Sequence, residues 1–341
     1  MKKLLGYTEF YVALVIIAMA TVITIMNPAF LTFQNLFGLL KSFSVIGIMA
    51  VGILFVLILG GTPDVSFVAI AQVVEYTVVI MTLQMGGSIF LAFLVAAVMG
   101  TILGSVNGFI LHFFRVPTIV VSIATFNIYF GLLYVFSEGQ VIYEVHEMFR
   151  NFAEIDVLTM TNAEGQSFGL ELMPIIWLAV LILGWFILQH TTLGRNIYAI
   201  GGNEVAARRV GINVFRARVF VFSFIGLLSG IAGIVHATIV QSAIPNSIVG
   251  SELDVIAAAV LGGASVFGGR GKVIGTFLGV SLFAIMNNGL TLLRISSYWY
   301  DVLIGLVIMI SITINALQAI RRERLKVNVN VEGEGVEEKT A

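Results

Sequence analysis

Polar side chains lie within or beside long apolar runs of this sequence, where they are costly unless they face the interior of a helix bundle. Most are neutral amides or hydroxyls, which donate and accept hydrogen bonds without holding a solute by fixed charge. That chemistry suits a pathway for a polar, uncharged solute that must leave as well as enter. The pathway candidates are Asp64, Ser66, Gln72, Glu75, Asn107, Asn127, Asn287 and Asn288.

For any one of these residues, an interhelical hydrogen bond of about 0.6–2 kcal/mol is the simpler interpretation. Glu75 is the exception, because it lies near the middle of an apolar run with no basic residue near it in the sequence. We expect Glu75 to accept a solute hydroxyl or to form a gating contact. Gln84 and Gln241 have comparable surroundings.

Residue patterns for other chemistry are missing from the sequence. There is no cysteine, and the four histidines are too far apart in the chain to form a helical metal pair. A Walker A loop needs Gly-Lys followed by Ser or Thr, whereas Val273 follows Gly271-Lys272. The sequence therefore predicts no catalytic residue, no metal site and no nucleotide bound by this chain.

The composition indicates that these side chains are carried by helices embedded in lipid. The chain is 59% hydrophobic and only 11% charged, whereas soluble domains are about 45–50% apolar and about 25% charged. A net charge of -1 gives no bias toward nucleic acid. We predict an all-α, polytopic transmembrane bundle of about ten spans. These spans cover residues 8–27, 37–60, 65–85, 88–113, 118–137, 170–190, 215–240, 252–268, 273–293 and 298–319. Breaks at residues 60–64 and 261–263 interrupt the apolar sequence beside the third span and within the eighth, and an unwound or re-entrant stretch is the alternative at each.

The distribution of basic residues selects one orientation. Fifteen of the 18 Lys and Arg residues fall on one side of this topology, and only Lys41, Arg150 and Arg294 fall on the other. The positive-inside rule then places both termini in the cytoplasm of a bacterial or archaeal cell. Residues 1–320 form the transmembrane domain, with an acidic outside loop at 137–170 and a cytoplasmic loop at 190–214. Residues 321–341 are predicted to form a disordered tail.

Two spans share a weak sequence repeat. Gly100-Thr101 leads to Asn107-Gly108 in the fourth span, and Gly275-Thr276 leads to Asn288-Gly289 in the ninth. An offset of five spans reverses the direction of travel, as in an inverted five-plus-five repeat. The spacing differs between the two copies, so chance is the alternative explanation.

The cytoplasmic loop predicts a short helix after a Gly201-Gly202 turn. Asn203 is a good N-cap, Glu204 suits the positive first turn, and Gly211 supplies a stop. This helix either lies on the membrane surface with its arginines toward lipid phosphates or docks on a cytosolic partner. The residues concerned are Asn203, Glu204, Val205, Ala206, Ala207, Arg208, Arg209 and Gly211.

Several motifs of this sequence resemble those of the ribose-type ABC permease family and follow one another in the same order as in that family. The cytoplasmic loop contributes Gly194-Arg195, Gly201-Gly202-Asn203, Ala206-Ala207-Arg208 and Gly211-Ile212. Further along lie Glu252-Leu253-Asp254, Leu261-Gly262-Gly263, Gly268-Gly269-Arg270-Gly271 and Asn287-Asn288-Gly289-Leu290, and upstream lie Asn107-Gly108, Arg115-Val116-Pro117 and Tyr129-x-Gly131. One stretch departs from the family: residues 60–67 contain an inserted residue and Pro63, and they lack the last glycine.

The resemblance implies a permease dimer, of two copies or of two related chains, in the inner membrane. It also implies a cytosolic ATPase pair that uses ATP and Mg²⁺, and an extracytoplasmic binding protein. The short cytoplasmic helix would then be the coupling helix of an importer for a sugar or sugar-like solute. Branched-chain amino acids or nucleosides are alternative cargoes, and an ion-coupled secondary transporter is the alternative class.

Overall fold

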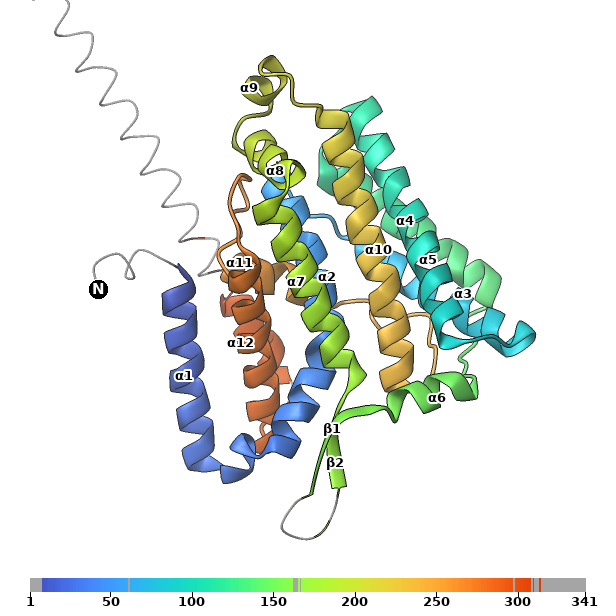
Figure 1. The fold of residues 1–341 in the computed structure, drawn as a ribbon, viewed down its shortest axis with the longest axis vertical. Helices are drawn as coiled ribbons and strands as arrows, with labels where there is room; N and C mark the ends of the chain where they lie inside the picture. Colours follow the sequence, from blue (N-terminus) through green and yellow to red (C-terminus); the bar gives the residue numbers. More distant parts are fainter. Residues whose placement is uncertain are drawn as a thin grey trace, which may run out of the picture.

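The computed structural model of the protein describes residues 8–60, 62–161, 165, 167–296, 298–307, 309 and 313. Eight of its helices are long and apolar enough to cross a membrane, which confirms the all-α polytopic bundle (Figure 1). They are α1 (Thr8–Met26), α2 (Phe33–Gly60), α3 (Ser66–Met85), α4 (Ile89–Phe114), α5 (Thr118–Ser137), α7 (Leu172–His190), α10 (Val214–Val240) and α12 (Val273–Leu292). A short 3-10 helix, η2 (Pro28–Leu31), joins α1 to α2.

The centre of the bundle is built on α2 and α10. Nearly every residue from Phe43 to Leu59 of α2 is buried, as expected for a helix that is hydrophobic on all sides. The outer helices α1, α4 and α5 leave much apolar surface uncovered, including Phe113 and Phe136. In a multi-pass membrane protein, lipid covers such surface.

Glycines allow α4 and α10 to pack closely. A Cβ atom built on Gly100 or Gly104 would collide with the backbone of Gly226 or Phe222. A Cβ atom on Gly226 or Gly230 would likewise meet the backbone of α4. These glycines therefore pack helix against helix.

The outside loop is more ordered than predicted. It contains α6 (Glu147–Ala153) and a hairpin of β1 (Asp156–Thr161) and β2 (Ser167–Glu171), paired antiparallel with Thr161 opposite Ser167. A bridge between Ile142 and Ala243 ties the loop to the segment after α10. The fold is therefore all-α except for one small hairpin.

The prediction of a full eighth span over 252–268 is wrong, and the alternative of a break at Leu261-Gly262-Gly263 is confirmed. The helix there is α11 (Glu252–Leu261), which has only 10 residues and is roughly 15 Å long. The segment 262–272 then turns at Gly263, Gly268, Gly269 and Gly271, whose φ angles are positive. Only residues 298–307, 309 and 313 of the predicted tenth span lie among the described residues, and the tail at 321–341 lies outside them.

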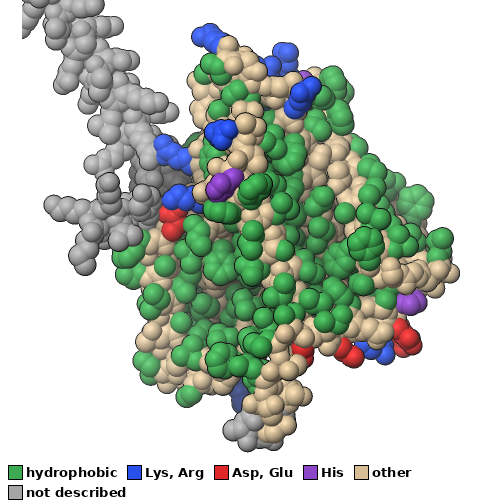
Figure 2. Space-filling model, in the orientation of Figure 1, with side chains coloured by type: hydrophobic (Ala, Val, Ile, Leu, Met, Phe, Trp, Pro, Cys, Tyr) green, Lys and Arg blue, Asp and Glu red, His purple; other side chains and the backbone are tan. Residues whose placement is uncertain are grey.

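The two ends of the bundle carry different charges. Lys and Arg side chains gather on the visible face around α8 (Thr192–Gly202) and α9 (Glu204–Arg209), whereas most visible acidic side chains lie at the opposite end (Figure 2). Hydrophobic side chains fill the band between them. The cytoplasmic placement of the basic end stays a prediction from the positive-inside rule.

The packing of the halves agrees with the inverted repeat, which stays a prediction. Helix α2 packs against α11 and α12, and α10 packs against α3 and α4. In the repeat α10 would correspond to α2, and α11 and α12 to α3 and α4. The first spans of the two halves, α1 and α7, do not follow this equivalence. Helix α1 packs against α12 of the other half, whereas α7 packs against α2.

Candidate functional site

A capped two-helix element forms the basic end of the molecule. Helix α8 continues through Gly201 and Gly202, so the predicted glycine turn is a helix end. Asn203 alone separates α8 from α9, and its Oδ1 accepts a hydrogen bond from the Ala206 N–H at 2.9 Å. Gly211 follows with φ +84, which ends the helix as predicted.

Glu204 fixes α9 to the bundle through Arg218 and also pairs with Arg208 of its own helix. Its Oε1 accepts from Arg208 at 2.6 Å and its Oε2 accepts from Arg218 of α10 at 3.0 Å. Burial raises the pKa of Glu204, but the hydrogen bond from Arg208 and the charges of Arg218 and Arg208 outweigh it and hold the pKa below its ordinary value. The triad therefore stabilises the fold above the ordinary pKa of a glutamate, and this contribution is lost as the pH falls through the lowered value.

The outward face of α9 combines apolar and basic side chains. Val205 is 61% exposed and Val210 is 77% exposed, and Arg209 is also exposed. Ala207 is buried and faces the bundle. Among the predicted coupling residues, Val205 and Arg209 thus point outward, whereas Ala207 packs α9 against the bundle.

Replacing Asn203 with alanine should weaken α9 by about 1 kcal/mol, because the Ala206 N–H loses its acceptor. We expect faster amide hydrogen exchange at Ala206 in purified permease. Asn196→Ala, within α8, is the matched control and should leave that exchange unchanged. Equal exchange in the wild type and Asn203→Ala would show that the cap does not hold this helix.

Helix α8 is fastened to the segment 262–272. The Tyr198 hydroxyl donates to the Gly271 carbonyl at 2.6 Å. The Gly269 N–H donates to the Ile58 carbonyl at the end of α2, at 2.8 Å. A Cβ atom at Gly201 would collide with that same carbonyl, so a glycine is needed where α8, α2 and this segment meet.

Three of the predicted pathway residues lie in one buried network. Asp64 accepts from the Ser66 N–H at 2.7 Å and from the Ser66 hydroxyl at 2.6 Å. Asn107 of α4 donates to the same hydroxyl oxygen at 2.6 Å. Tyr129 of α5 donates to the Leu103 carbonyl at 3.1 Å and lies 3.5 Å from Asn107 Oδ1. Tyr129 was not among the candidates, although it is part of the Tyr129-x-Gly131 motif.

Gln72 binds the segment 241–251. Its Nε2 donates to the Ile244 carbonyl at 2.8 Å, and its Oε1 accepts from the Ile248 N–H at 3.0 Å. Ser247 adds a hydroxyl donor at 3.3 Å. The stretch that precedes α11 is therefore held against α3 by a single amide.

Glu75 has a partner that no sequence pattern indicates. Its side chain is fully buried, and both carboxylate oxygens lie 3.0 Å from Nδ1 of His236 in α10. The two residues are 161 positions apart, so only the packing of α3 on α10 brings them together. The expectation of an isolated carboxylate is corrected to a buried carboxylate–imidazole pair.

The other candidates do not join these contacts. Asn127 is exposed on α5 and donates to the Ile123 carbonyl of its own helix. Asn288 exchanges two hydrogen bonds of 2.9 Å with Asn35, as an interhelical amide pair. Asn287 is half-buried on α12. Gln84 is exposed at the end of α3.

The interior thus offers hydrogen-bonding groups on three faces of α3. Ser66 faces α4, Gln72 faces the segment before α11, and Glu75 faces α10. No group of three or more metal-binding side chains occurs in the part of the chain that the structure describes. All three side chains are buried and hydrogen-bonded within the chain, and their contact with a solute stays a prediction.

Comparisons with known proteins agree with this arrangement. The family described as branched-chain amino acid transport system / permease component matches residues 35–312. The ribose import permease protein of Haemophilus influenzae is 34% identical over 305 residues, which cover 89% of this chain and 90% of that protein. The L-arabinose transport system permease protein of Escherichia coli K12 is 33% identical over 287 residues, covering 84% and 83%. The autoinducer 2 import system permease protein of Enterobacter sp. 638 is 32% identical over 310 residues, covering 91% and 87%. No solved structure matches the chain.

Proposed function

Since this chain belongs to the family of the branched-chain amino acid transport system permease component, we propose that it is the membrane-spanning subunit of an ABC importer for a sugar or sugar-like solute. The similar permeases named for ribose, L-arabinose and autoinducer 2 favour that cargo over an amino acid. The chain is a multi-pass protein of the bacterial inner membrane. It translocates solute and leaves ATP hydrolysis to a partner.

The observation that carries the proposal is the outward face of α9. This capped helix lies at the tip of the basic end (Figure 1), where it exposes Val205, Arg209 and Val210. We infer that this face docks on a cytosolic ATPase, which binds the ATP and Mg²⁺. Closure of the ATPase pair then presses on α9 and tilts the spans in an alternating-access cycle.

The remaining partners follow from the same assignment. An extracytoplasmic binding protein delivers the solute at the end formed by α6 and the hairpin. A second permease copy or a paralogue completes the transmembrane unit, and lipid covers the exposed apolar faces. Within this chain, we assign solute contact to the groups on α3 and to Asn107, with Asn127, Asn287 and Asn288 as the other candidates.

Two acidic substitutions on the outward face of α9 should abolish ATPase docking. In Val205→Glu with Arg209→Glu, an apolar anchor becomes charged and a cation becomes an anion, while buried Ala207 and the Glu204 pairs stay intact. We expect the ATPase that copurifies with the tagged wild-type permease to be lost from this variant.

The matched control is Val157→Glu with Arg294→Glu, which makes the same two changes at the opposite end of the molecule. It should retain the ATPase. Loss of the ATPase from the control instead would reverse the predicted orientation. If no nucleotide-binding protein copurifies with the wild type in mild detergent, and an uncoupler stops uptake at constant ATP, the transporter is ion-coupled.

A further inference from the structure

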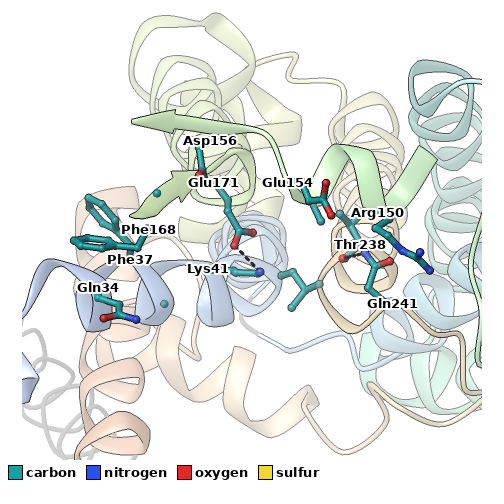
Figure 3. A pocket seen from close by; sticks show the side chains of 14 residues that line it. Gln34, Phe37, Lys41, Arg150, Glu154, Asp156, Phe168, Glu171, Thr238 and Gln241 are labelled. Carbon is teal, nitrogen blue, oxygen red and sulfur yellow. Dashed lines mark hydrogen bonds and ion pairs between the residues drawn. The ribbon is translucent and has the colours of Figure 1, made fainter. Parts of the chain in front are cut away.

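A cavity of about 550 Å³ opens at the end of the molecule formed by α6 and the hairpin (Figure 3). Its walls come from α2, α6, both strands and the end of α10. The volume lies within the range of about 300–1,000 Å³ typical of small-molecule sites. Of the polar residues considered as solute contacts, only Gln241 lines this cavity.

One wall is aromatic. Phe37 of α2 and Phe168 of β2 lie side by side, with ring centroids 6.1 Å apart and planes inclined by 52°. Both residues are half-buried and line the cavity. Aromatic faces carry partial negative charge, so they attract the weakly positive C–H groups on the flat face of a sugar ring.

The other walls offer hydrogen-bond acceptors. Glu171 accepts from Lys41 at 2.7 Å through Oε1, but its buried Oε2 accepts from no residue that the structure describes. Gln241 donates to the Thr238 carbonyl at 2.6 Å, while its buried Oε1 likewise has no donor among the described residues. Buried acceptors need donors, and both side chains line the cavity, so the hydroxyl groups of a bound solute can supply them.

The charges around the cavity exclude a strongly charged ligand. Lys41 and Arg150 face three carboxylates, of Glu154, Asp156 and Glu171. The near balance gives neither a polyanion nor a polycation a net attraction. Aromatic faces beside planar acceptors, with little net charge, suit a neutral polyhydroxylated molecule.

We propose that this cavity is a binding site for one neutral monosaccharide, held within a single permease chain before it enters the pathway. The sugar ring lies on Phe37 and Phe168, and its hydroxyls donate to Glu171 Oε2 and Gln241 Oε1. The inference rests on the proposed import of a sugar, and it adds a site that needs neither the binding protein nor a second permease.

Direct binding to the purified full-length permease, with no partner protein present, tests the site. Saturation-transfer difference NMR is recorded with free D-ribose, L-arabinose and D-glucose, and with L-leucine as the non-sugar probe. At least one sugar should give a signal, and L-leucine should give none. Phe37→Ala and Glu171→Gln should each weaken binding of that sugar by about tenfold, through the lost ring contact and the weakened acceptor.

Two matched controls test whether the effect belongs to the cavity. Phe136→Ala removes an exposed ring at the end of α5, and Glu147→Gln neutralises an exposed carboxylate on α6. Both should bind the sugar as the wild type does. Glutamine at 171 keeps an acceptor for Lys41, and size-exclusion profiles with melting temperatures verify that each variant is folded.

Import into proteoliposomes that also contain the ATPase and the binding protein separates this inference from the proposed function. If the wild type imports a sugar but none of the three sugars gives a signal on the permease, the cavity is not a sugar site. The same conclusion follows if the cavity variants bind sugar normally, or if they weaken only capture of the binding protein. A permease that imports no sugar overturns the proposed function itself.

Discussion

Gly226→Ala is expected to destabilise the permease by at least about 2 kcal/mol, the middle of the range for overpacked interiors. The new methyl group would collide with the Gly100 carbonyl and approach the Cα and N atoms of Gly104 to 2.9 and 3.0 Å. All three contacts are backbone atoms, which cannot move aside as a flexible side chain can. Helices α4 and α10 must therefore separate, with a lower melting temperature in detergent.

Gly131→Ala is the control for this prediction. Gly131 lies in α5 with nothing within 4 Å of an added Cβ atom, and alanine is the better helix former by about 1 kcal/mol. Its melting temperature should equal or exceed that of the wild type. If Gly226→Ala melts with the wild type, the close approach of α4 and α10 is not a packing constraint.

His236→Leu should destabilise the permease by about 3–5 kcal/mol, because it leaves the Glu75 carboxylate buried without its partner. Replacing both residues, Glu75→Leu with His236→Leu, should recover most of that loss, since two apolar side chains can fill the gap between α3 and α10. Thermal unfolding of the purified proteins measures both values.

Uptake by the double variant decides whether the pair acts in transport. We expect it to stay at least tenfold below the wild type while stability recovers, because Glu75 is proposed to contact solute hydroxyls, and a lost hydrogen bond to a charged group is worth about 1.5–3 kcal/mol. Uptake that recovers together with stability would assign the pair to packing alone.

Local signals in the sequence were sufficient to predict the spans and the capped helix. The α9 cap depends on residues a few positions apart, Asn203 and Gly211, and both act as predicted. The long apolar runs likewise determine most helix bounds by length alone. The prediction of a turn at Gly201-Gly202 was wrong, because Gly201 serves the close packing of α8 against the Ile58 carbonyl rather than a reversal of the chain.

Features that depend on distant contacts could not be predicted. Residues 252–268 are apolar enough to span, so the sequence could not decide whether the break at Leu261-Gly262-Gly263 ends the helix. In the structure it does, and Gly263 and Gly268 adopt left-handed backbone conformations. The hairpin forms within a polar loop. Neither the Glu75–His236 pair nor the outward direction of Asn127 can be read from the sequence, since both depend on how the helices rotate in the bundle.

The attachment of α8 to the segment 262–272 has a mechanical consequence for this transporter. Only Asn203 lies between α9 and α8, and α8 in turn grips the segment that follows α11 through Tyr198 and Gly271. Under the proposed docking, a push on α9 would reach α11 through α8, the Tyr198–Gly271 hydrogen bond and the segment 262–272. Helix α11 is only roughly 15 Å long, so it would be a short element for the ATPase to move within the membrane.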